Sequence, residues 1–578
     1  MVVKNVLRLG TALVLAGATL GSVPHAAGAT SGQHGHAAPT GTITITDWQF
    51  PDGCGPGAAS AANQEICGAM QDSMVSLAPN LTYFPDLATD IPSIKNGDAR
   101  VVGGNLVVDW TFKPHQRFSD GSPEGARDFV FSVNLDLALG NAFGIDQIQR
   151  MKILNPTTVE VTYKGLYAPY AAYGNPQPTI YPQAYFIKKY GSTDIKAIAA
   201  KFGNDVYNQP TDVFNGPFKI GSYTPNQSVV LVPNPYYTAL PPAAGHPLPA
   251  QIVFKNVATN ESGLVAQLNS PNSGVDKAED FQAADLPGLA NAKGYKVSNV
   301  PSLFVEHLEL NQAGPLKDVR LRQALQDAVD KRALYHALFP AVPQTQIDSA
   351  LLTSVLPNSS PFLDPSLKVS AYDPAKAKAL LKAAGYATDY NGPGAHLSLR
   401  FATTQSTVRQ LDFQVLSRDW AAVGVHVTPT FASGSISANG GLFSPYNLNG
   451  VLYTRHFDVA LFAYQETPDP QAQEYNFNPG LIPTATVHSA GDQNYTGVGL
   501  GADADEYALL DQARHTLDQG QRKAIFNRWQ QLVNQRVYFI MLYARSDITV
   551  DNGRIGNYIP NGSSAGNEWN AYQYYVKS

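Results

Sequence analysis

The residues best able to do chemistry lie in one stretch of the chain, residues 455–470, around an expected strand. The stretch contains Arg455, Tyr464, Glu466 and Asp469. A carboxylate at Glu466 or Asp469 could bind an ammonium group or another cation, and Arg455 could pair with a ligand carboxylate. The two carboxylates could also form a glycosidase pair, but such pairs are common by chance and require a separation of about 5–10 Å. The stretch therefore favours ligand binding over catalysis.

Signatures of catalysis or nucleotide binding are missing elsewhere in the sequence. It contains no G-x-S-x-G, H-E-x-x-H or G-x-x-x-x-G-K-[ST] motif. Gly497, Gly499 and Gly501 form G-x-G-x-G rather than the dinucleotide fingerprint, and no βαβ pattern surrounds them. We therefore expect a protein that is not an enzyme and that uses no cofactor and no metal.

The composition excludes two further classes of protein. Of the 578 residues, 44% are hydrophobic and only 15% are charged, which is enough apolar material for several cores and excludes disorder in the bulk of the chain. The formal net charge is −6, and no run of Lys and Arg reaches four residues, whereas a nucleic-acid binder would show a basic stripe. The 29 Tyr and 25 Phe residues suggest a partly aromatic surface.

An export signal is expected at the N-terminus. Residues 1–29 carry Lys4 and Arg8, then an apolar run from about Leu9 to Val23, and end in Ala27-Gly28-Ala29. This order is typical of a secretory signal peptide. No Cys lies in or just after it, which argues against a lipid anchor, and no later apolar run reaches 18 residues. We expect a periplasmic or secreted protein.

Two cysteines, Cys54 and Cys67, lie close together in the expected mature chain. An oxidising compartment would pair them as a disulfide, and two reduced, buried thiols are the alternative. A zinc site is disfavoured because no His or further Cys lies at ligand spacing. Residues 30–41 are expected to form a flexible segment, in which His34 and His36 could bind a metal ion only weakly.

Strands and helices are expected to alternate along the chain. Helices are expected after the N-caps Asp318 and Asp373 and from Ser122-Pro123, and a long one over about residues 504–536, which Gly520 could break. Strand-like alternation occurs at residues 42–46, 105–112, 158–163, 228–232, 251–257, 305–310 and 396–402. The mixture indicates an α/β or α+β class with more than one lobe.

Four separated blocks occur in order and at characteristic spacings. They are Pro85–Ala88 with Trp110–Lys113, Phe118–Pro123 and Ala126–Ser132; Asn215–Phe218 with Asn234–Tyr237; Asp318–Leu325 with Ala328–Lys331; and Tyr372–Ala377 with Ala384–Tyr386. Together they resemble the family-5 extracytoplasmic solute-binding proteins, the oligopeptide-, dipeptide- and nickel-binding components of ABC importers. Each block alone is a helix start, a turn or a strand end, so the blocks indicate the fold rather than the site.

The resemblance implies an α/β fold of the two-lobed type II periplasmic-binding (Venus-flytrap) class, with an extra subdomain in the first lobe. The lobes would close by hinge motion around a ligand that contacts both. The implied domains are residues 42–300 for lobe I, with the subdomain at about 85–210, residues 301–540 for lobe II, and residues 541–578 for a return to lobe I. The chain would cross between the lobes at Pro301 and near Leu542-Tyr543.

The function implied by the resemblance is capture of a peptide or similar small solute and its delivery to a membrane ABC permease. A monomer is expected, without nucleic acid as a partner. A receptor for a metal chelate, a sugar or another non-peptide solute is the first alternative. A secreted hydrolase on a similar scaffold is the second.

The resemblance also suggests which residues face the ligand. In peptide-binding relatives the corresponding strand leads to Trp-x-x-Asp, and that Asp pairs with the ammonium group of the peptide. Here Tyr464 replaces the Trp, and Thr467 stands at the Asp position unless a one-residue gap brings Glu466 there. His307 could equally be a structural histidine. The expected ligand-binding residues are Trp48, Phe50, Tyr170, Tyr173, Phe304, His307, Arg455, Tyr464, Glu466 and Asp469.

Overall fold

The computed structural model describes most of the chain beyond its N-terminal region. The described residues are 38–47, 49–58, 62–140, 144–172, 178–258, 260–435, 438–487, 493–499 and 504–577. The expected signal peptide, His34 and His36 lie outside the described residues.

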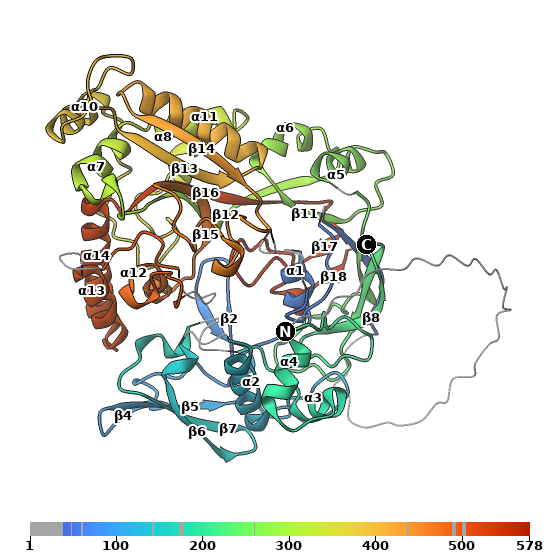
Figure 1. Cartoon of the computed structure of the whole chain (residues 1–578). Coiled ribbons are helices and arrows are strands. Elements are labelled where there is room, and N and C mark those ends of the chain that lie inside the picture. The colour runs from blue at the N-terminus through green and yellow to red at the C-terminus, as the bar shows by residue number, and fades with distance from the viewer. Residues whose placement is uncertain are drawn as a thin grey trace, which may run out of the picture. The chain divides into compact units, whose positions relative to one another are not determined.

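A ten-stranded mixed sheet runs through the chain in the order β14-β13-β15-β12-β16-β11-β1-β10-β9-β8 (Figure 1). β1 is parallel to β10 and β11, β13 is parallel to β14 and β15, and the other neighbours are antiparallel. The bounds are β1 Thr42–Thr46, β8 Phe218–Thr224, β9 Ser228–Pro233, β10 Gln251–Lys255, β11 Lys277–Phe281, β12 Lys296–Leu310, β13 Ser398–Thr404, β14 His426–Ala432, β15 Val459–Gln465 and β16 Phe539–Asp551.

The two long strands β12 and β16 join the two halves of this sheet. At one end of the pair β16 forms a ladder with β11, and at the other end β12 forms a ladder with β15. The register between β12 and β16 shifts between Pro301 and Val305. Pro301 has no N–H group to donate to the ladder, so an irregularity is expected there. The shift falls where the sequence places one crossing between the lobes, but the domain boundaries themselves stay a prediction.

A separate four-stranded antiparallel sheet lies within the expected subdomain, in the order β4-β5-β7-β6. Helix α2 (Ala126–Leu139) contacts β6 and β7, and Trp110 and Phe129 are buried in the core between them. The strands are β4 Ala99–Val102, β5 Asn105–Thr111, β6 Ile148–Asn155 and β7 Thr158–Tyr163. Two small two-stranded antiparallel sheets complete the described strands, β2 Val75–Leu77 with β3 Tyr83–Pro85 and β17 Ile555–Gly556 with β18 Tyr575–Val576.

The helices pack around these sheets; α11, for example, lies beside β14 (Figure 1). None of them, in the part of the chain that the structure describes, is long and apolar enough to cross a bilayer. Their remaining bounds are α1 Asn63–Gly68, α3 Gln183–Tyr190, α4 Ile195–Phe202, α5 Glu261–Leu268, α6 Leu286–Leu289, α7 Val319–Asp327, α8 Lys331–Leu338, α9 Gln344–Ala350, α10 Pro374–Ala383, α11 Thr407–Ala421, α12 Glu474–Phe477, α13 Asp505–Arg514 and α14 Gln519–Arg536.

Local capping signals predicted two helix starts correctly and missed others. Asp318 and Asp373 cap α7 and α10, each through a side-chain oxygen 2.9 Å from a backbone nitrogen of the first turn. The helix expected from Ser122-Pro123 begins only at Ala126, because the Asp128 carboxylate accepts the Gly125 N–H and fixes the start there (3.1 Å).

The long C-terminal helix expected over residues 504–536, with a possible break near Gly520, is present as two helices, α13 and α14. The break precedes Gly520, because Asp518 caps α14 by accepting the Gln521 N–H at 2.8 Å. The expected disulfide between Cys54 and Cys67 is confirmed, and it ties α1 to the segment before it.

Candidate functional site

A cavity of about 250 Å³ is lined by residues from two distant parts of the chain. Tyr83, Pro169 and Ala172 line it from the first half. The other lining residues come from the end of β15, the turn after it, α12 and Gln493. They are Tyr464, Gln465, Glu466, Thr467, Asp469, Gln471, Ala472, Gln473, Tyr475, Asn476 and Gln493. Three residues expected from the sequence, Tyr464, Glu466 and Asp469, thus meet at one cavity.

The turn after β15 is held in place by backbone and side-chain hydrogen bonds. The Glu466 N–H donates to the Leu303 carbonyl of β12 at 2.8 Å, directly after the β15–β12 ladder ends. The Thr467 hydroxyl donates to the Asp469 carbonyl at 2.6 Å, and an Asp469 side-chain oxygen accepts the Gln471 N–H at 3.0 Å. Asp469 thereby caps the short 3-10 helix Pro470–Gln473, which leads into α12. The cavity wall is therefore built on a fixed backbone.

The charge of Asp469 is balanced within the protein. Its two carboxylate oxygens accept hydrogen bonds from the Arg522 guanidinium at 2.6 and 2.7 Å. Arg522 is only 1% exposed and also donates to the Gln471 side chain at 3.1 Å. A bidentate, buried pair of this kind leaves little capacity for a ligand cation. Asp469 therefore contributes to the structure of the cavity wall rather than to binding of a ligand cation.

Glu466 is in a different state. It is 5% exposed, and its Oε2 accepts one hydrogen bond, from the Gln473 amide at 2.8 Å. No basic side chain among the described residues forms an ion pair with it. Burial raises the pKa of Glu466 to about 7, because the single hydrogen bond from Gln473 compensates only part of the lost hydration of the carboxylate. Of the two carboxylates that line the cavity, Glu466 is the one whose charge is left for a ligand to balance.

Tyr464 connects the cavity to a buried pair of residues behind it. Its ring stacks on the His307 ring at a centroid distance of 4.7 Å, and its hydroxyl donates to Glu309 Oε2 at 3.1 Å. His307 is 1% exposed, and its Nε2 lies 3.6 Å from the same Glu309 oxygen. The structure thus places His307 behind the wall, where it supports Tyr464 and does not line the cavity.

Other expected ligand-binding residues lie outside the cavity lining. Arg455 donates to the carbonyls of Tyr495 and Thr496 at 2.9 and 3.2 Å, and to the Asn311 side chain at 2.7 Å. These contacts hold a loop of the second half. Phe304 lies under the Arg545 guanidinium, 5.5 Å from the ring centroid.

In the first half, Tyr170 donates its hydroxyl to the Pro92 carbonyl at 3.1 Å, although its neighbours Pro169 and Ala172 line the cavity. Phe50 packs near Tyr223 against the core of the first half. Trp48 and Tyr173 lie outside the described residues.

Sequence reasoning missed the amide-rich character of the wall. Gln465, Gln471, Gln473 and Asn476 all line the cavity. Their signal is visible in the sequence as the run of Gln and Asn around Asp469, but side-chain amides are common in loops and carry no motif. Tyr83 was missed because the β2–β3 hairpin brings it across a long sequence separation.

Comparison with known proteins gives consistent matches. A family model described as bacterial extracellular solute-binding proteins, family 5, matches residues 82–480. The chain is 22% identical over 388 residues to a putative ABC transporter peptide-binding protein of Brucella ovis, which covers 65% of this chain and 66% of that protein. It is 26% identical over 238 residues to the probable D,D-dipeptide-binding periplasmic protein DdpA of Escherichia coli, covering 40% of this chain and 42% of DdpA.

Solved structures show the same fold. The substrate-binding protein CtaP of Listeria monocytogenes superimposes with a TM-score of 0.72 at 18% identity, covering 93% of this chain and all of CtaP. An oligopeptide-binding protein of Thermus thermophilus in complex with a pentapeptide gives a TM-score of 0.68 at 20% identity, covering 93% and 96% of the two chains. The expected two-lobed α/β fold is thereby confirmed.

Proposed function

The chain belongs to the family-5 bacterial extracellular solute-binding proteins, and on this premise we propose that it captures a small solute with a cationic group, such as a peptide with a free amino terminus, and delivers it to an ABC importer. The peptide-binding names of its relatives support the solute class. Lobes at about residues 42–300 and 301–540, with the return at 541–578, would close on the ligand as a monomer. The protein would act outside the cytoplasm and bind rather than transform its ligand.

One observation carries this proposal, the buried and unneutralised carboxyl group of Glu466 in the cavity wall. A ligand ammonium group at this position would supply the missing counter-charge, and the Gln and Asn side chains around it would hydrogen-bond a peptide backbone. The same charge argues against the alternative of an anionic metal chelate, because two like charges would meet in a desolvated site.

The test is calorimetric titration of the purified protein with di- to pentapeptides. We expect saturable binding of at least some peptides with a free amino terminus and none of the same peptides after N-acetylation. Small-angle scattering should show a more compact protein with ligand than without it. Flat titrations throughout would rule out the peptide class, and hydrolysis of a bound peptide would point to the secreted hydrolase instead.

Ligand affinity should also depend on pH. Because burial raises the pKa of Glu466 to about 7, its carboxylate is protonated as the pH falls below that value. A cationic ligand needs the ionised form of Glu466, so its affinity should fall up to tenfold per unit below pH 7; for a peptide it should also fall above about pH 8, where the α-ammonium group loses its own charge. Titrations in buffers from pH 5 to 9 measure this profile. An affinity that does not change across the range would show that Glu466 does not bind the ligand cation.

A further inference from the structure

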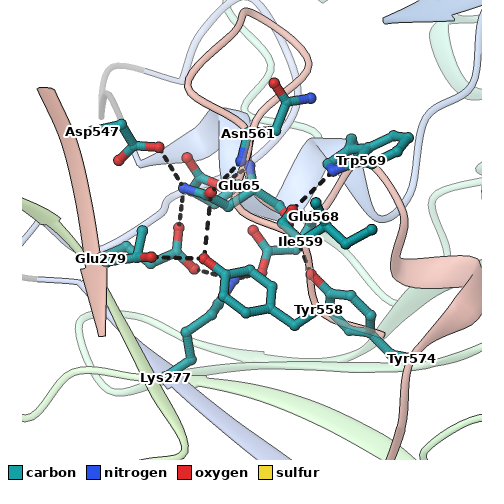
Figure 2. A network of polar contacts seen from close by, with 12 residues as sticks. Glu65, Lys277, Glu279, Asp547, Tyr558, Ile559, Asn561, Glu568, Trp569 and Tyr574 are labelled. Atoms are coloured by element: carbon teal, nitrogen blue, oxygen red, sulfur yellow. Dashed lines mark hydrogen bonds and ion pairs between the residues drawn. The ribbon is translucent and has the colours of Figure 1, made fainter. Parts of the chain in front are cut away.

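A second cluster of buried charges lies where α1, β11, β16 and the C-terminal segment (residues 557–574) meet (Figure 2). This carboxylate cluster contains Glu65, Glu279, Asp547 and Glu568, together with the single ammonium group of Lys277. Lys277 and Glu568 have no exposed side-chain surface, and Glu279 is buried as well. None of these residues lines the 250 Å³ cavity.

Lys277 is the counter-ion of this cluster. Its Nζ lies 2.6 Å from Glu279 Oε1, contacts Glu568 Oε1, and sits 4.5 Å over the ring of Tyr558. Glu65, Glu279 and Glu568 each offer an oxygen within 4.8 Å of the others, an arrangement that could hold a metal ion. The lysine, however, already occupies the space between two of these carboxylates (Figure 2). The resident cation is therefore part of the chain.

One ammonium group cannot balance this many carboxylates. Glu568 Oε2 is buried and has no hydrogen-bond partner among the described residues. Glu65 lies beside it, and Glu65 Oε2 accepts the Asn567 N–H at 2.9 Å. A proton on the Glu65 carboxyl group supplies the donor that Glu568 lacks. Burial, and then the neighbouring carboxylates Glu279 and Glu568, raise the pKa of Glu65 well above its usual value.

We propose that Glu65 and Glu568 share one proton, and that this proton fastens α1 to the C-terminal segment, which Lys277 in turn holds on β11. Contacts of the C-terminal segment with β2 and β3 link this cluster to the ligand cavity. From the C-terminal segment, Asn561 donates to the Leu77 carbonyl of β2 at 3.1 Å, and the Trp569 ring packs edge-on against Phe84 at 5.9 Å. The adjacent Tyr83 on β3 lines the cavity. Loss of the proton would loosen this wall, so the cluster is a pH-sensitive device.

The direction of the pH effect follows from the charges. An acid whose pKa is raised by folding stabilises the folded state at low pH, and this contribution is lost as the pH rises through the raised value. Lys277 keeps its charge because its pKa is raised by Glu279 and Glu568 despite burial. Tyr558 and Tyr574 stay protonated because burial raises their pKa values. Asp547, with a pKa of about 7, titrates in the same direction as Glu65.

Hydrogen exchange of the ligand-free full chain tests the proposal. Between pH 6 and pH 8.5, after correction for intrinsic rates, amides of α1 and the C-terminal segment should exchange about tenfold faster or more in the wild type. In Glu65→Gln the amide replaces the protonated acid, and the increase should fall below threefold. Asp547 is present in both proteins, so its titration is common to them.

Two further variants complete the experiment. Glu568→Gln should show a similarly reduced response, which covers the case that Glu65→Gln does not fold. Glu124→Gln changes another buried acid with a raised pKa, hydrogen-bonded to Asn215 and outside the cluster, and it should keep the wild-type response. A wild type whose exchange ignores pH, or a Glu65→Gln variant that responds like the wild type, would overturn the proposal. No ligand is added, so the outcome is independent of the proposed peptide specificity.

Discussion

Glu466→Gln is expected to weaken binding of a peptide with a free amino terminus by about 30-fold to 1,000-fold. The amide keeps the shape and the hydrogen bond with Gln473, but among the described lining residues it removes the one carboxylate that no basic side chain balances. Removing one partner of a buried, hydrogen-bonded charge pair costs about 2–4 kcal/mol of binding free energy. Calorimetry of the two proteins with one peptide measures the difference.

Two controls separate this effect from general damage to the site. Glu474, the first residue of α12, is also a buried acid with a pKa of about 7, but Arg514 pairs with it at 3.2 Å and it does not line the cavity. Glu474→Gln should change the affinity by less than about threefold, or roughly 0.6 kcal/mol. Glu466→Gln should also lose the fall in affinity below pH 7. Equal losses in both variants would assign the effect to the turn and not to the Glu466 charge.

The parts of the fold that depend on local interactions could be predicted from the sequence. Strand Thr42–Thr46 and the caps at Asp318 and Asp373 agree with the structure because alternation and capping act over a few residues. The misplaced start of α2 has the same origin, since Ser122-Pro123 and Gly125 with Asp128 are competing local signals. Local signals could not predict the two-lobed arrangement of these elements. That arrangement was predicted from the resemblance of the four blocks to a known family.

The chemistry of the site depended on partners distant in the sequence. Glu466 and Asp469 are three residues apart and equally acidic, yet one is neutralised by Arg522, which is 53 residues further along, and the other is not. The sequence allowed Arg455 to pair with a ligand carboxylate, whereas its Nε and Nη2 donate to loop carbonyls. Lys277 and Glu568 meet across 291 residues. Whether a charge is available to a ligand is thus a property of the folded chain.

Arg522→Ala is expected to lower the free energy of unfolding by about 3–5 kcal/mol, because it leaves the Asp469 carboxylate buried without its partner. The guanidinium also donates hydrogen bonds to the Ala513 carbonyl at 3.1 Å and to the Gln471 side chain. The turn that forms the cavity wall would lose these hydrogen bonds in the variant. Urea unfolding followed by tryptophan fluorescence measures the loss, provided that the transition is two-state.

The matched control lies on the same helix. Arg528 is exposed on α14, and Arg528→Ala should change stability by less than about 0.5 kcal/mol. In the double variant Asp469→Asn with Arg522→Met neither position of the pair carries a charge. The double variant should therefore be clearly more stable than Arg522→Ala alone. Recovery of stability without recovery of peptide affinity would show that the pair positions Gln471 in the wall. If Arg522→Ala is as stable as Arg528→Ala, the Asp469 carboxylate does not depend on Arg522, and it becomes a second candidate for the ligand cation.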